Sequence, residues 1–219
     1  GTAQALTETR LVADISGRVV AVSPNIRAGG VFSKGDILAK IDSRDFEVEL
    51  DIAISQAADI EVKYIQELAQ AELAAKEWNE TPESKAARKL ALREPQLAAA
   101  KASLQAAKSR VKRARLNLLR TEVVAPFDGK VLEQLIDIGE FVTPSQTIAS
   151  IYSIDVVEVR LPIKVDDLEH LLLPEGVTLA NELPEVLFES DMGNKTFQWI
   201  GKIVRTEGAF DPRTRMLYV

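Results

Sequence analysis

Apolar residues follow two different patterns along this chain, and the changes of pattern divide it into parts. In residues 5–42, short apolar runs are separated by turn residues such as Pro24-Asn25 and Gly29-Gly30, which is typical of short β-strands. Residues 122–152 show the same pattern. Residues 44–121 contain no glycine and are rich in strong helix formers. The pattern therefore predicts β-structure on both sides of a helical insertion.

The two β-rich segments share a short motif. VADISGRVVAV (Val12–Val22) and VAPFDGKVLEQ (Val124–Gln134) each contain Val-Ala, a spacer, Gly, a basic residue and Val. Neither half can bury its apolar face alone, so residues 11–43 and 122–152 are expected to form one quasi-symmetric β-sandwich.

Glycines at matching places indicate matching turns, because glycine adopts positive φ at little cost. Aligning the two halves by their glycines puts Gly35 on Ser145 and Leu38 on Ile148. The structural glycines assigned to this split sandwich are Gly17, Gly29, Gly35, Gly129 and Gly139.

Apolar positions in the helical segment step by alternating threes and fours, which is the heptad pattern of a coiled coil. One run extends from Phe46 to Trp78 and is interrupted by Glu67; the other extends from Leu90 to Thr121 and is interrupted by Arg93. The pattern predicts two antiparallel helices of roughly 36 residues each, about 54 Å long.

The bend between these helices is expected near residues 79–83, the midpoint of the segment 44–121. Thr81 can cap a helix that has Pro82 at its first position. Pro95 does not fit a straight second helix, because it must either kink that helix or mark a restart. The sequence leaves these two alternatives open.

Charge supports the antiparallel pairing independently. Residues 45–80 hold ten acidic residues against two lysines, and residues 84–121 hold eleven basic residues against one glutamate. The fold-back sets Glu47, Glu49 and Asp51 opposite Arg113, Arg115 and Arg120. Each exposed pair contributes only about 0.3–0.5 kcal/mol, so these charges select the register rather than supply the stability.

Short strands return after Tyr152. Residues Val156–Ile163 and Phe197–Val204 are predicted as strands, Val165–Glu169 as a short helix, and Asp211–Thr214 as a turn into a last strand at Met216–Val219. Residues 1–10 and 153–219 are assigned to a small, incomplete β-barrel. The chain is expected to be cut at both ends, with any membrane anchor outside it.

Composition excludes several classes of function. The net charge of −6 opposes nucleic acid as the main partner. The chain has no cysteine and a single histidine, His170, so no metal site is predicted. No nucleophile–base pair is recognisable, so we predict a protein that is not an enzyme and uses no cofactor. No apolar run approaches the roughly 20 residues needed to cross a bilayer.

The chain resembles the periplasmic adaptor, or membrane fusion, proteins of tripartite efflux pumps (haemolysin-D-like and RND efflux adaptors), whose split domain is similar to lipoyl and biotinyl carriers. The matching segments are Val12–Val19, Gly29–Leu38, Leu116–Thr121 with Ala125–Val131, Gly201–Val204 and Asp211–Arg215. The resemblance implies an elongated α+β protein of several domains: a split lipoyl-like β-sandwich, an inserted antiparallel coiled-coil hairpin and a partial β-barrel.

The resemblance also implies partners and a location. It implies a periplasmic protein of a Gram-negative bacterium that is anchored to the inner membrane, contacts an inner-membrane transporter of the RND type, and assembles as a hexamer. The membrane-proximal domain of the family is expected to lie outside this chain. The hairpin tip would dock on the outer-membrane channel, and the residues assigned to it are Trp78, Asn79, Glu80, Thr81, Pro82, Glu83, Lys85 and Arg88. Trp78 can alternatively close the coiled-coil seam.

Three other functions are compatible with parts of this pattern. An adaptor of an ABC-type exporter or of type I protein secretion uses the same parts, although secretion adaptors tend towards much longer hairpins. A biotinyl or lipoyl carrier presents a lysine on a tight turn between the halves, whereas Lys40 falls within the strand pattern Ile37–Ile41. A purely structural coiled-coil scaffold would not need the duplicated β halves.

Overall fold

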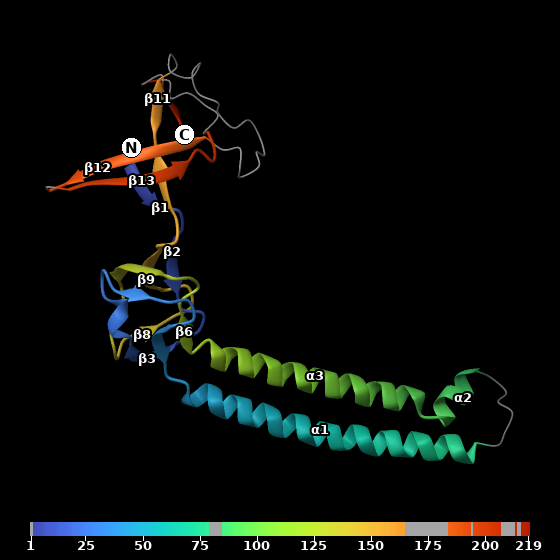
Figure 1. Ribbon diagram of the computed structural model, residues 1–219. Helices are drawn as coiled ribbons and strands as arrows, with labels where there is room; N and C mark the ends of the chain where they lie inside the picture. Colours follow the sequence, from blue (N-terminus) through green and yellow to red (C-terminus); the bar gives the residue numbers. More distant parts are fainter. Residues whose placement is uncertain (1, 79–84, 165–183, 194, 207–212, 214–215) are drawn as a thin grey trace. The chain divides into compact units, whose positions relative to one another are not determined.

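The structure, a computed structural model, describes residues 2–78, 85–164, 184–193, 195–206, 213 and 216–219. Contacts divide the chain into two compact units, one made of Gly1–Thr7 with Ile154–Val219 and the other of Glu8–Ser153. The unit Glu8–Ser153 combines a small β-sandwich with two long helices that leave it side by side (Figure 1).

Eight short strands form the sandwich as two four-stranded antiparallel sheets, with the orders β2-β9-β7-β4 and β6-β5-β3-β8. The strands are β2 (Glu8–Val12), β3 (Gly17–Val22), β4 (Val31–Phe32), β5 (Ile37–Ile41), β6 (Glu122–Val124), β7 (Gly129–Gln134), β8 (Phe141–Val142) and β9 (Thr147–Ser153). Each sheet contains strands from both sides of the helical insertion, which confirms that the two repeated segments build one sandwich.

The two halves of the sandwich are related by an approximate two-fold repeat. Exchanging β2, β3, β4 and β5 with β6, β7, β8 and β9 converts one sheet order into the other. Main-chain bonds repeat in the same way: the Gly29 N–H donates to the Val131 carbonyl and the Gly139 N–H donates to the Val19 carbonyl, both at 2.8 Å.

The glycines of the sandwich either adopt positive φ or lie where there is no room for a Cβ. Gly29, Gly35 and Gly139 have φ of +82°, +90° and +91°, and Ser145 adopts +70° at the place equivalent to Gly35. Gly129 instead lies where the main-chain oxygen of Tyr152 and the ring of Phe32 leave no room for a Cβ. Gly17 occupies the equivalent place in the other half, against the side chain of Ile41.

Aliphatic side chains from both halves fill the core between the sheets. Leu38 and Ile148, aligned by the repeat, are both fully buried. The largest fully buried side chains are Ile26, Leu38, Ile41, Ile148, Ile151, Val19, Val131 and Val142.

The assignment of residues 1–10 to the barrel is wrong for its last three residues. Glu8–Val12 forms β2, which pairs with β9 from Glu8↔Tyr152 onwards. Thr9 and Leu11 are half-buried and alternate with exposed neighbours, so the strand lays one face on the sandwich.

The described part of the helical insertion forms three helices, α1 (Arg44–Glu77), α2 (Lys85–Ala91) and α3 (Glu94–Leu119). Helices α1 and α3 run antiparallel and side by side, while α2 turns away from the line of α3 (Figure 1). The second predicted helix is therefore divided. Pro95 lies in the first turn of α3, so of the two alternatives for this proline the structure shows the restart.

Among the described residues of the unit Gly1–Thr7 with Ile154–Val219 there are three antiparallel strand pairs, β1–β10, β11–β14 and β12–β13. Their bounds are β1 (Thr2–Ala5), β10 (Val157–Arg160), β11 (Pro162–Lys164), β12 (Glu185–Met192), β13 (Lys195–Lys202) and β14 (Met216–Tyr218). The strand expected at Val156–Ile163 is two strands with different partners. The short helix expected at Val165–Glu169, His170, and the turn residues other than Arg213 lie outside the described residues.

Candidate docking surface

Both ends of the helical insertion are fixed to the same part of the sandwich. The main-chain N–H of Ile41, at the end of β5, donates to the carbonyl of Thr121, just before β6, at 2.8 Å. The Thr121 side chain is buried, and its Oγ1 donates to the Leu118 carbonyl at 2.7 Å. Arg120 reaches Asp14 of the sandwich, with 3.6 Å between Nε and Oδ2. The two helices therefore leave the sandwich from adjacent, anchored points.

A local ion pair marks the start of α1. Arg44 places its Nη2 2.6 Å from Oδ2 of Asp42. Hydrogen bonds from the Arg44 side chain, and then from its main-chain N–H, lower the pKa of Asp42 to about 2. Asp42 therefore stays ionised at the N-terminus of α1, where the helix dipole favours a negative charge.

Small residues dominate the contact between α1 and α3. Its buried members are Ala53 and Ala71 from α1 and Leu104, Ala107 and Ala114 from α3. Alanine allows two helices to approach closely but removes little apolar surface from water. The contact between α1 and α3 is therefore thin: it holds the two helices side by side but buries little side-chain surface.

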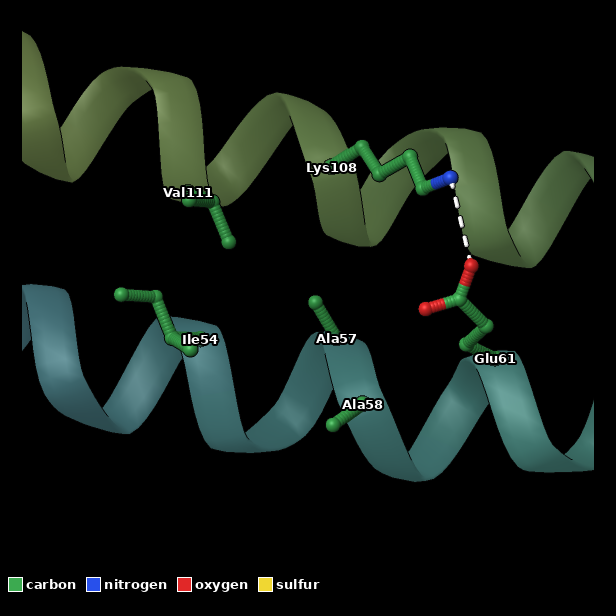
Figure 2. Close-up of a pocket in the computed structure, with 6 residues that line it drawn as sticks. All are labelled: Ile54, Ala57, Ala58, Glu61, Lys108 and Val111. Carbon is green, nitrogen blue, oxygen red and sulfur yellow. Dashed lines mark ion pairs between the residues drawn. The ribbon is translucent and has the colours of Figure 1, made fainter.

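A shallow cavity of about 300 Å³ lies on the flank of this contact. Figure 2 shows Ala57 of α1 and Val111 of α3 pointing towards the opposite helix within it. Lys108 spans the helices here, with its Nζ 3.5 Å from Oε1 of Glu61, and both side chains are about half exposed. Nothing in this cavity resembles a catalytic arrangement: one apolar floor is bordered by one solvated ion pair.

A second ion pair crosses the hairpin where α2 and α3 meet. The Arg93 guanidinium donates to both carboxylate oxygens of Glu67, at 2.7 Å from Nε and 3.0 Å from Nη2. The Glu67 side chain is only 19% exposed. Hydrogen bonds from Arg93 lower the pKa of Glu67. Arg93 itself adopts φ +57°, a left-handed conformation that is uncommon for a residue other than glycine.

Of the charge pairing expected near the sandwich, the structure contradicts the part that involves Arg120. Within the described part of the chain, the ion pairs that join α1 to the returning arm are Glu61–Lys108 and Glu67–Arg93. Arg120, expected opposite the acidic start of α1, lies beyond the end of α3 and pairs with Asp14 instead.

The structure describes part of the predicted tip. Trp78 ends α1 with an extended backbone and a half-buried side chain, Lys85 begins α2, and Arg88 is exposed in α2. The remaining tip residues, Asn79, Glu80, Thr81, Pro82 and Glu83, lie outside the described residues. The sequence marked Glu67 and Arg93 as interruptions of two seams but did not connect them.

Two further properties concern the described residues only. No helix among them combines the length and the apolar character needed to cross a bilayer. Their acidic side chains nowhere gather in a group of three or more that could hold a metal ion.

The fold is that of a β-sandwich interrupted by a helical hairpin, and comparison with known families agrees. The model of the CzcB-like barrel-sandwich hybrid domain matches residues 7–153, and the chain belongs to this family. The matched range contains both halves of the sandwich and the whole helical insertion. The resemblance seen in the sequence is thereby confirmed at the level of the family.

Individual relatives extend beyond this domain. The multidrug resistance protein MdtA of Photorhabdus laumondii is 28% identical over 225 residues, which cover 98% of this chain and 52% of that protein. The MdtA of Proteus mirabilis is 28% identical over 79% of this chain and 42% of its own length. The chain therefore spans about half the length of these relatives or less.

Solved structures share the fold. A MacA–MexA chimera that contains the α-hairpin domain of Pseudomonas aeruginosa MexA superposes with a TM-score of 0.64 and 23% identity, covering 99% of this chain and 70% of the chimera. The membrane fusion protein Spr0693 of Streptococcus pneumoniae gives a TM-score of 0.65 and 18% identity, covering all of this chain and 86% of its own.

Proposed function

We propose that this chain belongs to a periplasmic adaptor of a tripartite efflux pump, which bridges an inner-membrane transporter to an outer-membrane channel and catalyses no reaction. The observation that carries the proposal is the anchored helical pair. Helix α1 has 34 residues and is about 51 Å long. The residues just before α1 and just after α3 are held together at the sandwich by the Ile41–Thr121 hydrogen bond and the Arg120–Asp14 ion pair. This anchorage suits an arm that projects from the sandwich in a fixed direction.

The parts of the chain receive different roles in this proposal. The sandwich of residues 8–43 and 122–153 is a collar, and residues 44–121 form a coiled-coil hairpin whose tip, from Trp78 to Arg88, meets the channel by helix-to-helix packing. The remaining strands, residues 1–7 and 154–219, belong to a β-barrel that contacts the transporter.

The type of pump is proposed on the basis of the relatives. Two relatives named multidrug resistance protein support efflux as the process, and we propose an RND-type transporter as the inner-membrane partner. An arm of about 51 Å also favours efflux over type I secretion, whose adaptors resemble this chain but tend towards longer hairpins. The location proposed is the periplasm of a Gram-negative bacterium, with the protein anchored to the inner membrane.

Self-association is part of the proposal, as a ring of six copies. Helix α1 is predominantly acidic and α3 predominantly basic, so the two flanks of one hairpin carry opposite charge. Side-by-side copies would set the acidic flank of one against the basic flank of the next. Such electrostatic complementarity selects orientation more than it adds affinity.

The carrier-domain alternative receives no support at its candidate lysine. Lys40 lies within β5 rather than on a turn, and its Nζ is 2.7 Å from Oε1 of Glu122. A carrier lysine must instead be presented to the enzyme that modifies it. An intact mass equal to that of the unmodified chain would complete the exclusion.

The proposal is tested by site-directed crosslinking in cells, starting from a protein without cysteine. Ala86→Cys and Arg88→Cys place single thiols on exposed positions of α2. Lys34→Cys, exposed on a turn of the sandwich, is the matched control. We expect a short bifunctional reagent to link the α2 positions, and not position 34, to an outer-membrane protein.

The outcomes separate the alternatives. Crosslinks from position 88 to an outer-membrane channel support an adaptor that spans the periplasm. Crosslinks only to cytoplasmic proteins, or equal yields of the channel product from positions 34 and 88, would contradict the orientation proposed for the hairpin.

A further inference from the structure

The two charged residues that interrupt the seams of the hairpin meet each other at its only described break. Every other position of the predicted seams from Phe46 to Trp78 and from Leu90 to Thr121 is apolar, apart from the terminal threonine. Glu67 and Arg93 are joined by two hydrogen bonds of 2.7 and 3.0 Å. A bidentate contact of this kind fixes direction as well as distance, because the guanidinium and the carboxylate are both planar.

Arg93 also lies between the two neighbouring helices, since α2 ends at Ala91 and α3 begins directly after it at Glu94. Its N–H donates to the Leu90 carbonyl of α2 at 3.0 Å, and its carbonyl accepts from the N–H of Leu97 in α3 at 2.9 Å. Its φ of +57° turns the chain out of the path of α3. Holding the Arg93 side chain on α1 therefore holds the point at which α2 departs from α3.

The choice of residue types indicates that direction, and not stability, is what this pair provides. A left-handed position is most easily occupied by glycine, and an apolar pair would fill a helix–helix seam at least as well as an ion pair. The chain uses an arginine and a glutamate instead. A polar pair inside an apolar seam is best known as a device that specifies register and orientation.

We propose that Glu67 and Arg93 are positioning residues that set the direction of α2, and with it the presentation of the hairpin's far end to its partner. The second half of this inference rests on the function proposed above; the first half stands on the hairpin alone. Glu67 anchors the contact from α1, and Arg93 transmits it to the α2–α3 junction.

The direction of α2 is measured directly with two spin labels in the chain, which has no cysteine of its own. Ala75→Cys on α1 and Ala86→Cys on α2 are both exposed and belong to neither the pair nor the buried seam. We expect a single narrow distance distribution for the parent. Glu67→Gln should broaden it, whereas Glu72→Gln, the same change at an exposed carboxylate of α1, should leave it unchanged.

Arg93→Gly separates the side chain from the backbone. Glycine keeps the left-handed conformation accessible but cannot bind Glu67. Broadening in both Glu67→Gln and Arg93→Gly assigns the effect to the ion pair, because Glu67→Gln leaves the backbone at residue 93 unchanged. Broadening that is reversed in the charge-exchanged double variant Glu67→Arg/Arg93→Glu supports positioning. Unchanged distributions in Glu67→Gln and Arg93→Gly would overturn the proposal, as would a loss of helical signal that accounts for the broadening.

Presentation to the partner is read separately, by crosslinking from Arg88→Cys in cells. We expect Glu67→Gln to lose most of the crosslinked product and the charge-exchanged pair to recover it. Yields unaffected by Glu67→Gln contradict the role in presentation, even where the spin labels show that α2 is released. A parent that forms no channel product contradicts the proposed function instead, and the distance measurement then remains the test of the Glu67–Arg93 pair.

Discussion

The sandwich and the helical pair of the unit Glu8–Ser153 are stabilised in opposite ways. The sandwich buries eight large aliphatic side chains almost completely, whereas the buried residues of α1 and α3 are four alanines and Leu104. Buried apolar area is the main source of folding free energy, so the sandwich supplies most of the free energy that stabilises this unit. The helices depend instead on helix propensity and on anchorage at their roots. The helical pair can thus project from the sandwich although most of the buried apolar surface stays in the sandwich.

Truncation of a buried side chain is the strongest test of this contrast. Leu38→Ala and Ile148→Ala each remove a fully buried aliphatic group from the sandwich and should lower the free energy of unfolding by about 2–5 kcal/mol. Leu104→Ala, in the helical seam, should cost less than about 2 kcal/mol, because the thin contact can close around it. Denaturant unfolding followed by circular dichroism measures all three, and an equal cost for Leu38 and Leu104 would remove the distinction.

A second test asks whether the close packing of the sandwich includes its main chain. Gly129→Ala would push a methyl group against the Tyr152 main-chain oxygen, which has no freedom to move aside. We expect a loss of about 1–3 kcal/mol in the free energy of unfolding. Gly29→Ala has open space around it and meets only the cost of φ +82°, about 1–2 kcal/mol. Thermal unfolding of both variants measures the two losses. A Gly129→Ala variant as stable as the parent would contradict the close approach of the Tyr152 main-chain oxygen to residue 129.

Left-handed residues occur in both regions and should respond differently to glycine. Ser145 has φ +70°, and its side chain makes no hydrogen bond among the described residues. Ser145→Gly should therefore raise the free energy of unfolding by about 0.5–1 kcal/mol. Arg93→Gly gains the same backbone relief but loses the contact with Glu67, so its net gain should be smaller. Differential scanning calorimetry of both variants sharpens the comparison, and a lower melting temperature for Ser145→Gly would contradict it.

The sequence predicted the sandwich well because a repeat constrains the backbone twice. Each half needs the same turns, so the glycine pattern reveals equivalent places even where one turn carries Ser145 instead of a glycine. The strand β12 was missed, since Val186-Leu187-Phe188 forms an uninterrupted apolar run without the alternation of a half-exposed strand. Residues 8–10 were misplaced for a related reason, because a strand at a domain boundary has the same pattern whichever unit it joins.

The helical pair was predicted less completely because the fold-back count assumes two unbroken helices. That count places Glu67 opposite residue 99, whereas the structure joins it to Arg93. Pro95 signalled a disturbance, but a proline in the first turn of a new helix and a proline that kinks a continuous helix look alike in sequence. The left-handed Arg93 carried no signal of its own, since arginine is a good helix former.

The smallest effect is expected at the exposed ion pair of the hairpin. Glu61 and Lys108 are 3.5 Å apart and about half exposed, unlike the bidentate pair at Glu67. A double-mutant cycle of Glu61→Gln and Lys108→Gln should give a coupling of no more than about 0.5 kcal/mol, which 0.5 M salt should reduce further, since the Debye length falls below roughly 5 Å. Both glutamines are good helix formers, so the cycle isolates charge from propensity. A coupling that persists at high salt would show that the contact between α1 and α3 depends on its flanking charges for stability. Helix propensity and anchorage at the sandwich would then not be enough to explain the stability of the helical pair.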